Sequence, residues 1–272
     1  MKYDPIKREL GGVFNKKPVL RKLFYRLLDV LLLRTWHVKR AIKSNFKNCK
    51  KTPLQTLDAG MGFGQYSYFL ARKFPAWQIK GIDVKEEQVF DCNSFFKEAG
   101  LKNAYFFKQD LTELKDENCY DFILSVDVME HIEEDDQVFS CFFRAMKSNG
   151  MLLISTPSDQ GGSDVHEHDK DEHSFIDEHV RDGYNIDAIQ EQLKKAGFSR
   201  TEAHYSYGIP GRISWNLSMK FPISILNVSK LFYTILPFHY IIFFPWCLLL
   251  NWIDATSQHK TGTGLIVKAW KE

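Results

Sequence analysis

From residue 54 the sequence alternates apolar, strand-like runs with segments of helical period, and this alternation constrains the fold more than any other feature. Apolar residues three and four apart predict helices, and short apolar runs predict buried strands. Their alternation is typical of a doubly wound α/β domain with a mostly parallel sheet. The predicted strands span residues 54–60, 77–84, 104–110, 120–127, 150–157, 199–207 and 263–270, and the predicted helices span residues 64–74, 85–100, 134–150 and 186–196.

The N-terminal segment lies outside this alternation and is strongly basic. Residues 1–53 carry fifteen Lys and Arg against three Asp and Glu, although the net charge of the whole chain is only +2. Residues 18–47 alternate basic side chains with Leu, Phe and Trp, as an amphipathic helix or helix pair would. We expect residues 1–53 to form a helical extension and residues 54–272 to form the main domain. The basic extension could bind nucleic acid, anionic lipid or the acidic body of its own domain.

A second outlying segment, residues 209–256, separates the last two predicted strands and is very apolar. Residues 231–253 contain no Asp, Glu, Lys or Arg, which is long enough to raise the question of a membrane span. A single crossing would put the strand at 263–270 on the wrong side of the bilayer, and Pro237 and Pro245 should interrupt a straight helix. We therefore expect in-plane membrane contact or a lid over a lipophilic acceptor. A buried cap, a homodimer interface and a true span stay open.

The cysteine content and the first residues of the chain indicate the cellular compartment. The five cysteines are odd in number and show no C-x-x-C spacing, which argues for a reducing compartment. The charged opening MKYDPIKREL does not lead into an apolar run with a cleavage site. We expect a cytoplasmic protein, peripheral on the inner face of a membrane.

The strongest motif is TLDAGMGFGQYSYFLA, in which a strand ends near Asp58 and passes through Gly60, Gly62 and Gly64 into a helix. Glycines allow a sharp turn and close approach to a ligand, and the N-terminus of the helix offers free N–H groups. A dinucleotide site would require G-x-G-x-x-G, but residue 65 is Gln. Asp83 ends the next strand, where a carboxylate can accept hydrogen bonds from ribose hydroxyls.

The sequence KQDL at residues 108–111 follows the third predicted strand. Asp110 could accept a hydrogen bond from an adenine amino group, and the Leu111 N–H could donate to the ring. With LDAGMGFG, GIDV, QDL, YDFILSVDVMEHI and GMLLISTP in this order, residues 54–207 resemble the class I S-adenosylmethionine-dependent methyltransferases. The resemblance is to the small-molecule branch similar to ubiquinone and menaquinone biosynthesis methyltransferases.

That resemblance implies a Rossmann-like, seven-stranded methyltransferase sheet, here with N-terminal basic helices and an apolar helical insertion before the last strand. It also implies S-adenosylmethionine as cofactor. By the resemblance, the methionine end would lie at the glycine loop, the ribose at Asp83, the adenine near the third strand, and the sulfonium where the fourth strand ends. The implied cofactor residues are Asp58, Gly60, Gly62, Gly64, Asp83, Val84, Asp110, Leu111, Val126 and Asp127.

The general base is less constrained than the cofactor site. Histidine titrates near neutral pH and is the usual base for a phenol or alcohol. His131 in VMEHI matches a family position near cofactor and acceptor, although a packed histidine there is an equal alternative. Glu130 and Asp127 could act in the site or only as charges near a helix N-terminus.

Four of the nine histidines lie in SDVHEHDKDEHSFIDEHVRDGY, residues 163–184. Since this stretch follows the fifth strand, residues 158–184 should form a lid beside the acceptor pocket. His166, His168 and His173 are candidate bases or ligands, or belong to a solvated lid without a chemical role. Their spacing matches no closed zinc pattern, so we predict no metal site, while a divalent cation stays open. His179 should be structural, with Arg181 pairing a nearby carboxylate.

The sequence thus predicts a methyltransferase that acts on an oxygen, less favourably a carbon, of a lipophilic small molecule such as a phenolic quinone precursor, aryl polyene or polyketide-like phenol. Residues 18–47 and 209–256 are the expected membrane contacts, and no nucleic acid is expected. A protein or nucleic-acid methyltransferase, a non-enzymatic cofactor-binding module and a nicotinamide oxidoreductase remain alternatives.

Overall fold

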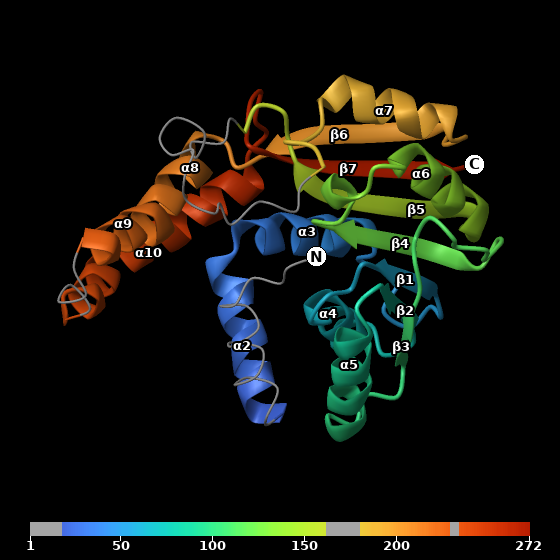
Figure 1. Cartoon of the computed structure of the whole chain (residues 1–272), viewed down its shortest axis with the longest axis horizontal. Coiled ribbons are helices and arrows are strands. Elements are labelled where there is room, and N and C mark those ends of the chain that lie inside the picture. The colour runs from blue at the N-terminus through green and yellow to red at the C-terminus, as the bar shows by residue number, and fades with distance from the viewer. Residues whose placement is uncertain (1–17, 162–179, 229–233) are drawn as a thin grey trace.

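The computed structural model describes residues 18–161, 180–228 and 234–272, and within them a seven-stranded sheet forms the centre (Figure 1). The strand order is β3-β2-β1-β4-β5-β7-β6, and only β7 runs antiparallel to its two neighbours among these strands. The strands are β1 (Gln55–Ala59), β2 (Gln78–Asp83), β3 (Ala104–Lys108), β4 (Tyr120–Val126), β5 (Met146–Pro157), β6 (Arg200–Ser206) and β7 (Gly264–Lys271). This confirms the predicted doubly wound α/β fold.

Helices cover both faces of the sheet and create two apolar cores. Helices α6 (Asp135–Ala145) and α7 (Ile186–Lys195) pack on one face. Helices α3 (Leu33–Asn45), α4 (Gln65–Lys73) and α5 (Glu86–Glu98) pack on the other. Because both faces are covered, most residues of β1 and β4 are buried, and even the polar Thr56 and Asp58 of β1 lie inside.

The basic N-terminal segment forms two helices that belong to the second core. Helix α2 (Pro18–Leu31) buries Arg21 and Tyr25, and α3 buries Val38 and Ile42. Figure 1 shows α3 lying across the sheet and α2 projecting beside α5. The opposite face of α2 exposes apolar side chains, namely Val19, Leu23, Leu27, Val30 and Leu31.

The apolar insertion forms a helical arm that leaves the sheet after β6 and returns before β7. It contains α8 (Ile209–Trp215), a π-helical turn (Asn216–Lys220), α9 (Phe221–Val228) and α10 (Leu236–Thr256). In Figure 1 the arm extends away from the sheet. Helix α10 is long and apolar enough to cross a membrane, and it is the one such helix among the described residues.

Two sequence-based expectations about these elements were wrong. The predicted helix 134–150 ends at Ala145, and Met146–Gly150 belong to β5. Pairing across the sheet decides this, since Met146 lies opposite Tyr120 and the Lys147 ammonium is bonded to Asp121 at 2.9 Å. Pro245 does not interrupt α10, which continues to Thr256, and Pro237 lies in the first turn, where proline is tolerated.

Candidate active site

The glycine loop follows β1 at the carboxyl edge of the sheet. Gly60, Gly62 and Gly64 all have positive φ angles, of 72°, 51° and 72°. A Cβ at Gly60 would lie 2.4 Å from the Val128 side chain, whereas a Cβ at Gly62 would have no neighbour closer than 3.8 Å. Gly60 is therefore required for packing, and the loop is open above Gly62. Gly64 is the N-cap of α4, without a side-chain cap on the first N–H groups of the helix.

Asp58 lies beneath this loop and is fully buried in β1. Its carboxylate accepts a hydrogen bond from the Ser67 hydroxyl at 2.5 Å, which ties β1 to the first turn of α4. Burial raises the pKa of Asp58 to about 6, although the Ser67 hydrogen bonds act in the opposite direction. Asp58 thus supports the loop from behind, because its side chain is shielded from a ligand in front.

Asp83, at the end of β2, lies beside the glycine loop. One carboxylate oxygen accepts the N–H of Gly62 at 3.0 Å, and the other accepts the N–H of Lys85 at 2.9 Å. The side chain is only half-buried, so each oxygen keeps a lone pair for a further donor. Asp83 can therefore hold two ribose hydroxyls while it fixes the glycine loop.

The predicted adenine residues gather beside Asp83, at the ends of β2 and β3. Val84 exposes 46% of its surface, which is unusual for an apolar residue at this edge. Leu111 is buried, while Asp110 is exposed and accepts hydrogen bonds from the N–H and hydroxyl of Thr112 at 2.9 and 2.8 Å. These contacts engage one oxygen of Asp110 and leave the second for an amino group. An apolar surface with an adjacent acceptor suits a purine ring.

Asp127 follows β4 directly after Val126 and has a left-handed φ of 52°. Its carboxylate forms an ion pair with Arg34, which α3 brings across the sheet edge. Arg34 is also held through its backbone N–H, which donates to the Tyr207 hydroxyl at 3.0 Å. Tyr207 follows β6 and has a φ of 57°. Non-glycine residues in this region are strained, and such strain is concentrated at functional sites.

Arg34, Asp127 and Tyr207 line one cavity of about 170 Å³ at the carboxyl ends of β4, β5 and β6. Because β7 is antiparallel, its first residues lie at the same edge. Hydroxyl groups make up much of the remaining wall, which consists of Ser155, Thr156, Pro157, Ser206, Thr263 and Gly264. The cavity therefore offers one guanidinium, one carboxylate and several hydroxyls, a polar lining suited to the head of a small acceptor.

Glu130 and His131 lie in the short 3₁₀ turn Met129–His131 after β4. Glu130 is 1% exposed and accepts a hydrogen bond from the Thr156 hydroxyl at 3.1 Å. Burial raises the pKa of Glu130, while its own backbone N–H, His131, Thr156 and Arg34 act in the opposite direction. His131 is half-buried. Because Thr156 lines the cavity, its hydrogen bond to Glu130 joins this turn to the cavity wall.

The other predicted bases, His166, His168 and His173, lie outside the described residues, as does His179. Arg181 is described, and the prediction that it pairs a carboxylate is confirmed by its ion pair with Asp135. Its guanidinium also donates to the carbonyl of Ile132 at 2.7 Å, so it fixes the turn that carries His131. Within residues 18–161, 180–228 and 234–272, no three His, Cys, Asp or Glu side chains converge as a metal site would require.

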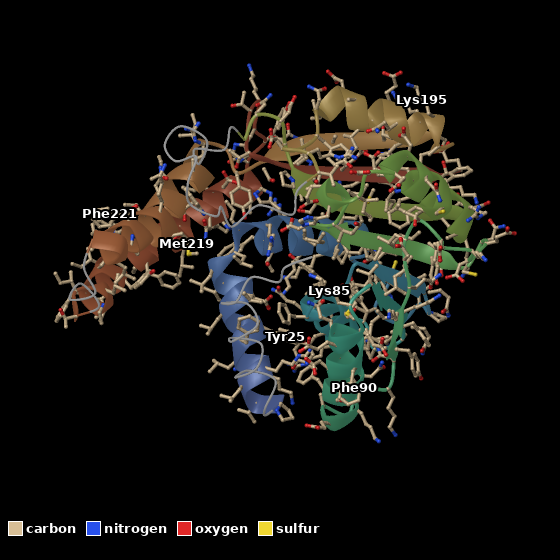
Figure 2. The ribbon with its side chains drawn as sticks, in the orientation of Figure 1. Tyr25, Lys85, Phe90, Lys195, Met219 and Phe221 are labelled. Carbon is tan, nitrogen blue, oxygen red and sulfur yellow. The ribbon has the colours of Figure 1, made fainter. Side chains whose placement is uncertain are left out.

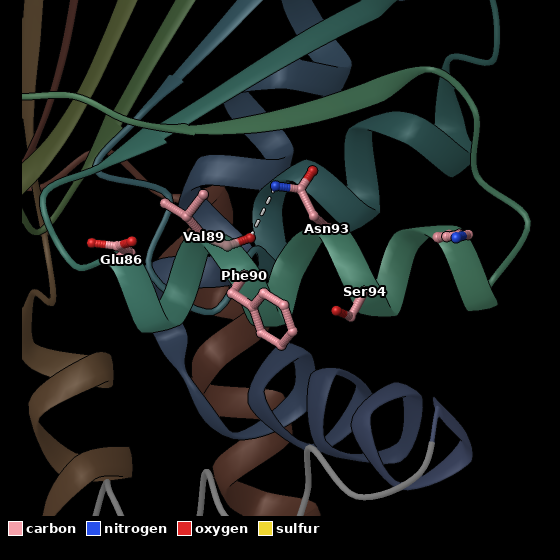
Figure 3. A pocket seen from close by; sticks show the side chains of 6 residues that line it. Glu86, Val89, Phe90, Asn93 and Ser94 are labelled. Carbon is pink, nitrogen blue, oxygen red and sulfur yellow. Dashed lines mark hydrogen bonds between the residues drawn. The ribbon is translucent and has the colours of Figure 1, made fainter.

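A larger hollow, of about 370 Å³, lies on the outer surface of α5 (Figure 3). All of its described lining residues belong to that one helix, and they are Glu86, Val89, Phe90, Asn93, Ser94 and Lys97. It lacks the converging strand ends and glycine loop of the smaller cavity. We therefore take the edge between the glycine loop and Tyr207 as the active site.

Arg34 and Tyr207 were not among the residues predicted from sequence. Tyr207 could have been found, since β6 is parallel to β5 and its carboxyl end must lie at the same edge. Arg34 gave no such signal, because its position depends on how α3 crosses the sheet.

Comparison with known proteins places this site in context. A family model described as Methyltransferase domain matches residues 50–204. The chain is 28% identical over 124 residues to a ubiquinone biosynthesis O-methyltransferase from Rickettsia canadensis, covering 46% of this chain and 50% of that protein. The chain thus spans about half the length of this curated relative.

Solved structures with the same fold include phosphoethanolamine N-methyltransferase 2 from Haemonchus contortus, in complex with phosphomonomethylethanolamine and S-adenosylhomocysteine. Its TM-score is 0.59 at 21% identity, covering 87% of this chain and 52% of that chain. The cyclase SpnF is similar with a TM-score of 0.57 at 18% identity, covering 87% and 80%. At these identities the likeness concerns the fold.

Proposed function

The chain belongs to the Methyltransferase domain family and is a class I enzyme that uses S-adenosylmethionine, and from this premise we propose that it methylates an oxygen of a lipophilic small molecule at a membrane surface. A phenolic quinone precursor or a related phenol is the acceptor class, and transfer to carbon is the less favoured variant. The proposed place of action is the cytoplasmic face of a membrane.

One observation carries this proposal: the apolar arm begins and ends at the rim of the acceptor cavity. Tyr207 lines the cavity, and only Gly208 separates it from Ile209, the first residue of α8, which is 71% exposed. At the other end, α10 ends at Thr256, and the segment after it leads to Thr263 and Gly264, which also line the cavity. A lipophilic tail leaving the cavity would therefore meet an apolar surface.

The exposed side chains of the arm support membrane contact. On α10, Phe238, Ile241, Trp246 and Trp252 are 67%, 73%, 62% and 56% exposed. Figure 2 shows Met219 and Phe221 on the same arm, away from the sheet. Both ends of the arm return to one sheet, so it can enter a bilayer from one side only. Lys22 on α2 adds attraction to anionic headgroups. A homodimer through the arm is the competing arrangement.

The residues at the sheet edge suit the cofactor. The open space above Gly62 would receive its methionine part, Asp83 its ribose hydroxyls, and Val84 and Asp110 its adenine. Arg34 would pair with its carboxylate, since a guanidinium is the natural partner of that group. When bound, S-adenosylmethionine supplies a methyl group already activated by positive charge on sulfur.

The residues of the chain then have to orient the acceptor and accept the proton that its hydroxyl group loses. The hydroxyls of the cavity would hold the polar head of the acceptor in line with the methyl group, and such alignment supplies much of the rate. We propose His131 as the base that removes the acceptor's hydroxyl proton, with buried Glu130 behind it. His166, His168 and His173 remain alternative bases.

Placement of the basic helices weakens the case for a macromolecular substrate. Arg21 is buried, Arg34 faces Asp127, and Lys39 forms an ion pair with Asp29. Several basic groups are thus engaged inside the protein, where they cannot bind a nucleic-acid backbone.

Methyl transfer from labelled S-adenosylmethionine by the full chain tests the proposal directly. The acceptors would be an isoprenoid-substituted catechol in anionic vesicles, phosphoethanolamine, bulk RNA and a histone mixture. We expect a methyl ether of the catechol, identified by mass spectrometry. Transfer confined to phosphoethanolamine, RNA or protein would overturn the proposal.

A further inference from the structure

Beneath the glycine loop, α2 places a buried arginine and a buried tyrosine against the loop backbone. The carbonyl of Phe63, between Gly62 and Gly64, accepts a hydrogen bond from Arg21 Nη2 at 2.9 Å and another from the Tyr25 hydroxyl. Arg21 Nε also donates to the Tyr25 oxygen at 2.8 Å, so the two side chains act together. Figure 2 labels Tyr25 on α2, on the side of α4 and α5.

Arg21 joins the loop to α5 as well. Its Nη1 donates to the carbonyl of Asp91 at 3.0 Å, and its Nη2 contacts the Cys92 sulfur at 3.2 Å. The guanidinium lies 4.8 Å from the centre of the Phe95 ring. Cys92 in turn contacts the carbonyl of Gly62 at 3.7 Å. A single guanidinium therefore links α2, the glycine loop and α5.

Space filling does not account for this arrangement. Arg21 is 3% exposed and Tyr25 is 1% exposed. Removing a guanidinium from water is costly, and an apolar side chain of similar size could fill the same volume without that cost. What the arginine adds is a set of directed hydrogen bonds to backbone carbonyls.

The loop needs such bonds because three of its residues are glycines with positive φ, which have many alternative conformations. Asp83 holds the N–H of Gly62 from the ligand side, at 3.0 Å. The Arg21 and Tyr25 pair holds the next residue's carbonyl from the opposite side. Together they fix two polar groups of the loop backbone, the N–H of Gly62 and the carbonyl of Phe63.

We propose that Arg21 and Tyr25 are positioning residues for cofactor binding, contributed by a helix outside the matched methyltransferase region. The family match begins at residue 50, and α2 ends at Leu31. The pair does not touch the cofactor; it holds the glycine loop in its binding conformation. This role is independent of which acceptor the enzyme uses.

Titration calorimetry with S-adenosylhomocysteine on the full-length protein tests this role. Arg21→Met should weaken binding roughly tenfold or more, and Tyr25→Phe should weaken it roughly threefold to tenfold, since each loses hydrogen bonds to the loop. Arg21→Lys should not restore affinity, because an ammonium cannot reach the same set of carbonyls. Arg26→Met, an exposed arginine on the same helix, is the matched control and should bind like the wild type.

Steady-state kinetics and hydrogen exchange separate positioning from general destabilisation. KM for S-adenosylmethionine should rise in Tyr25→Phe with little change in kcat at saturating cofactor, and amide exchange should increase at residues 61–64. If Arg21→Met does not fold, Tyr25→Phe decides alone. Affinity equal to that of Arg26→Met, or a fall in kcat with unchanged cofactor affinity, would overturn the proposal.

Discussion

Asp83 shows how one side chain can serve both the fold and the ligand. Its two oxygens fix the N–H groups of Gly62 and Lys85, one on each side of the strand end. Under the proposed function, the same oxygens would also accept hydrogen bonds from two ribose hydroxyls. A carboxylate already held by two backbone donors loses little conformational freedom on binding, which favours tight recognition.

Replacing this carboxylate should weaken cofactor binding. We expect Asp83→Ala to reduce the affinity for S-adenosylhomocysteine by roughly 1–3 kcal/mol, because ribose hydroxyls lose a charged acceptor. Calorimetry provides the measurement, and Glu87→Ala, an exposed carboxylate on α5, provides the control. Unchanged affinity in Asp83→Ala would remove Asp83 from the site.

His131 should matter for the rate and not for cofactor binding. If it takes the acceptor proton, His131→Ala should lower kcat by roughly 10²–10⁴-fold while S-adenosylhomocysteine binds as before. Retention of wild-type kcat would shift the base to another group.

The candidate cofactor residues were easier to find in the sequence than the candidate acceptor residues, because the former follow directly after strands. Gly60, Gly62 and Asp83 lie where a strand ends, so a short stretch of sequence contains both the strand and the side chain. Arg34 and Tyr207 meet only because α3 and β6 converge at one edge. Such meetings depend on packing between segments that are distant along the chain.

Among the elements, the strands were predicted well because short segments rich in apolar and buried residues alternate with helical segments. Strands β1 to β4 begin and end within two residues of their predicted limits. The start of β5 was missed because Met146–Gly150 carry no local strand signal and join the sheet through the pairing of Met146 with β4 and of Gly150 with β7. The packing of α2 and α3 on the sheet also had no signature beyond their amphipathic pattern.

Helix α10 provides the sharpest test at this scale. At about 1.5 Å per residue its 21 residues span about 31 Å, and 17% of its most apolar stretch is buried. We expect Ile241→Asp to reduce co-sedimentation with anionic vesicles, because a carboxylate resists entry into the bilayer. Phe90→Asp on α5 is the matched control, since Phe90 and Ile241 are 71% and 73% exposed. Equal binding by both variants, or none by the wild type, would contradict membrane contact.

At the scale of the whole molecule, Asp254 connects the arm to the body. It is fully buried, accepts from His37 of α3 at 2.8 Å, and lies 3.3 Å from His259. It also accepts the backbone N–H groups of Tyr207 and Gly211 at 3.2 and 2.9 Å. Burial raises the pKa of Asp254, but the hydrogen bond and charge of His37, the charge of His259 and the Gly211 N–H together lower it below its ordinary value. Its stabilising contribution is therefore present at neutral pH and is lost only in strong acid.

His204 should make the fold sensitive to milder acid. Burial, with His37, Lys268 and His259 nearby, lowers the pKa of His204 to about 4. The unfolded chain takes up this proton near pH 6.5 and the folded chain does not, so stability falls as pH drops between these values. Asp58, whose pKa is raised, changes the stability in the opposite direction as pH falls. The contribution of His204 must therefore be measured by comparing a variant with the wild type.

We expect the loss of unfolding free energy from about pH 7 to about pH 5 to be about 2 kcal/mol smaller in His204→Asn than in the wild type. Urea denaturation at the two pH values provides the measurement. An identical loss in both proteins would show that His204 does not control the acid response.

Under the proposed function, the size of the cavity beside Arg34 limits which part of the acceptor the enzyme can select. A cavity of about 150 Å³ accommodates benzene, and the cavity beside Arg34 has about 170 Å³. One aromatic ring would fill it, and any long tail would have to remain outside along the arm. The enzyme should therefore discriminate among ring substituents and tolerate tails of many lengths, so that its kcat/KM changes steeply with a methyl group on the ring and little with an added isoprene unit.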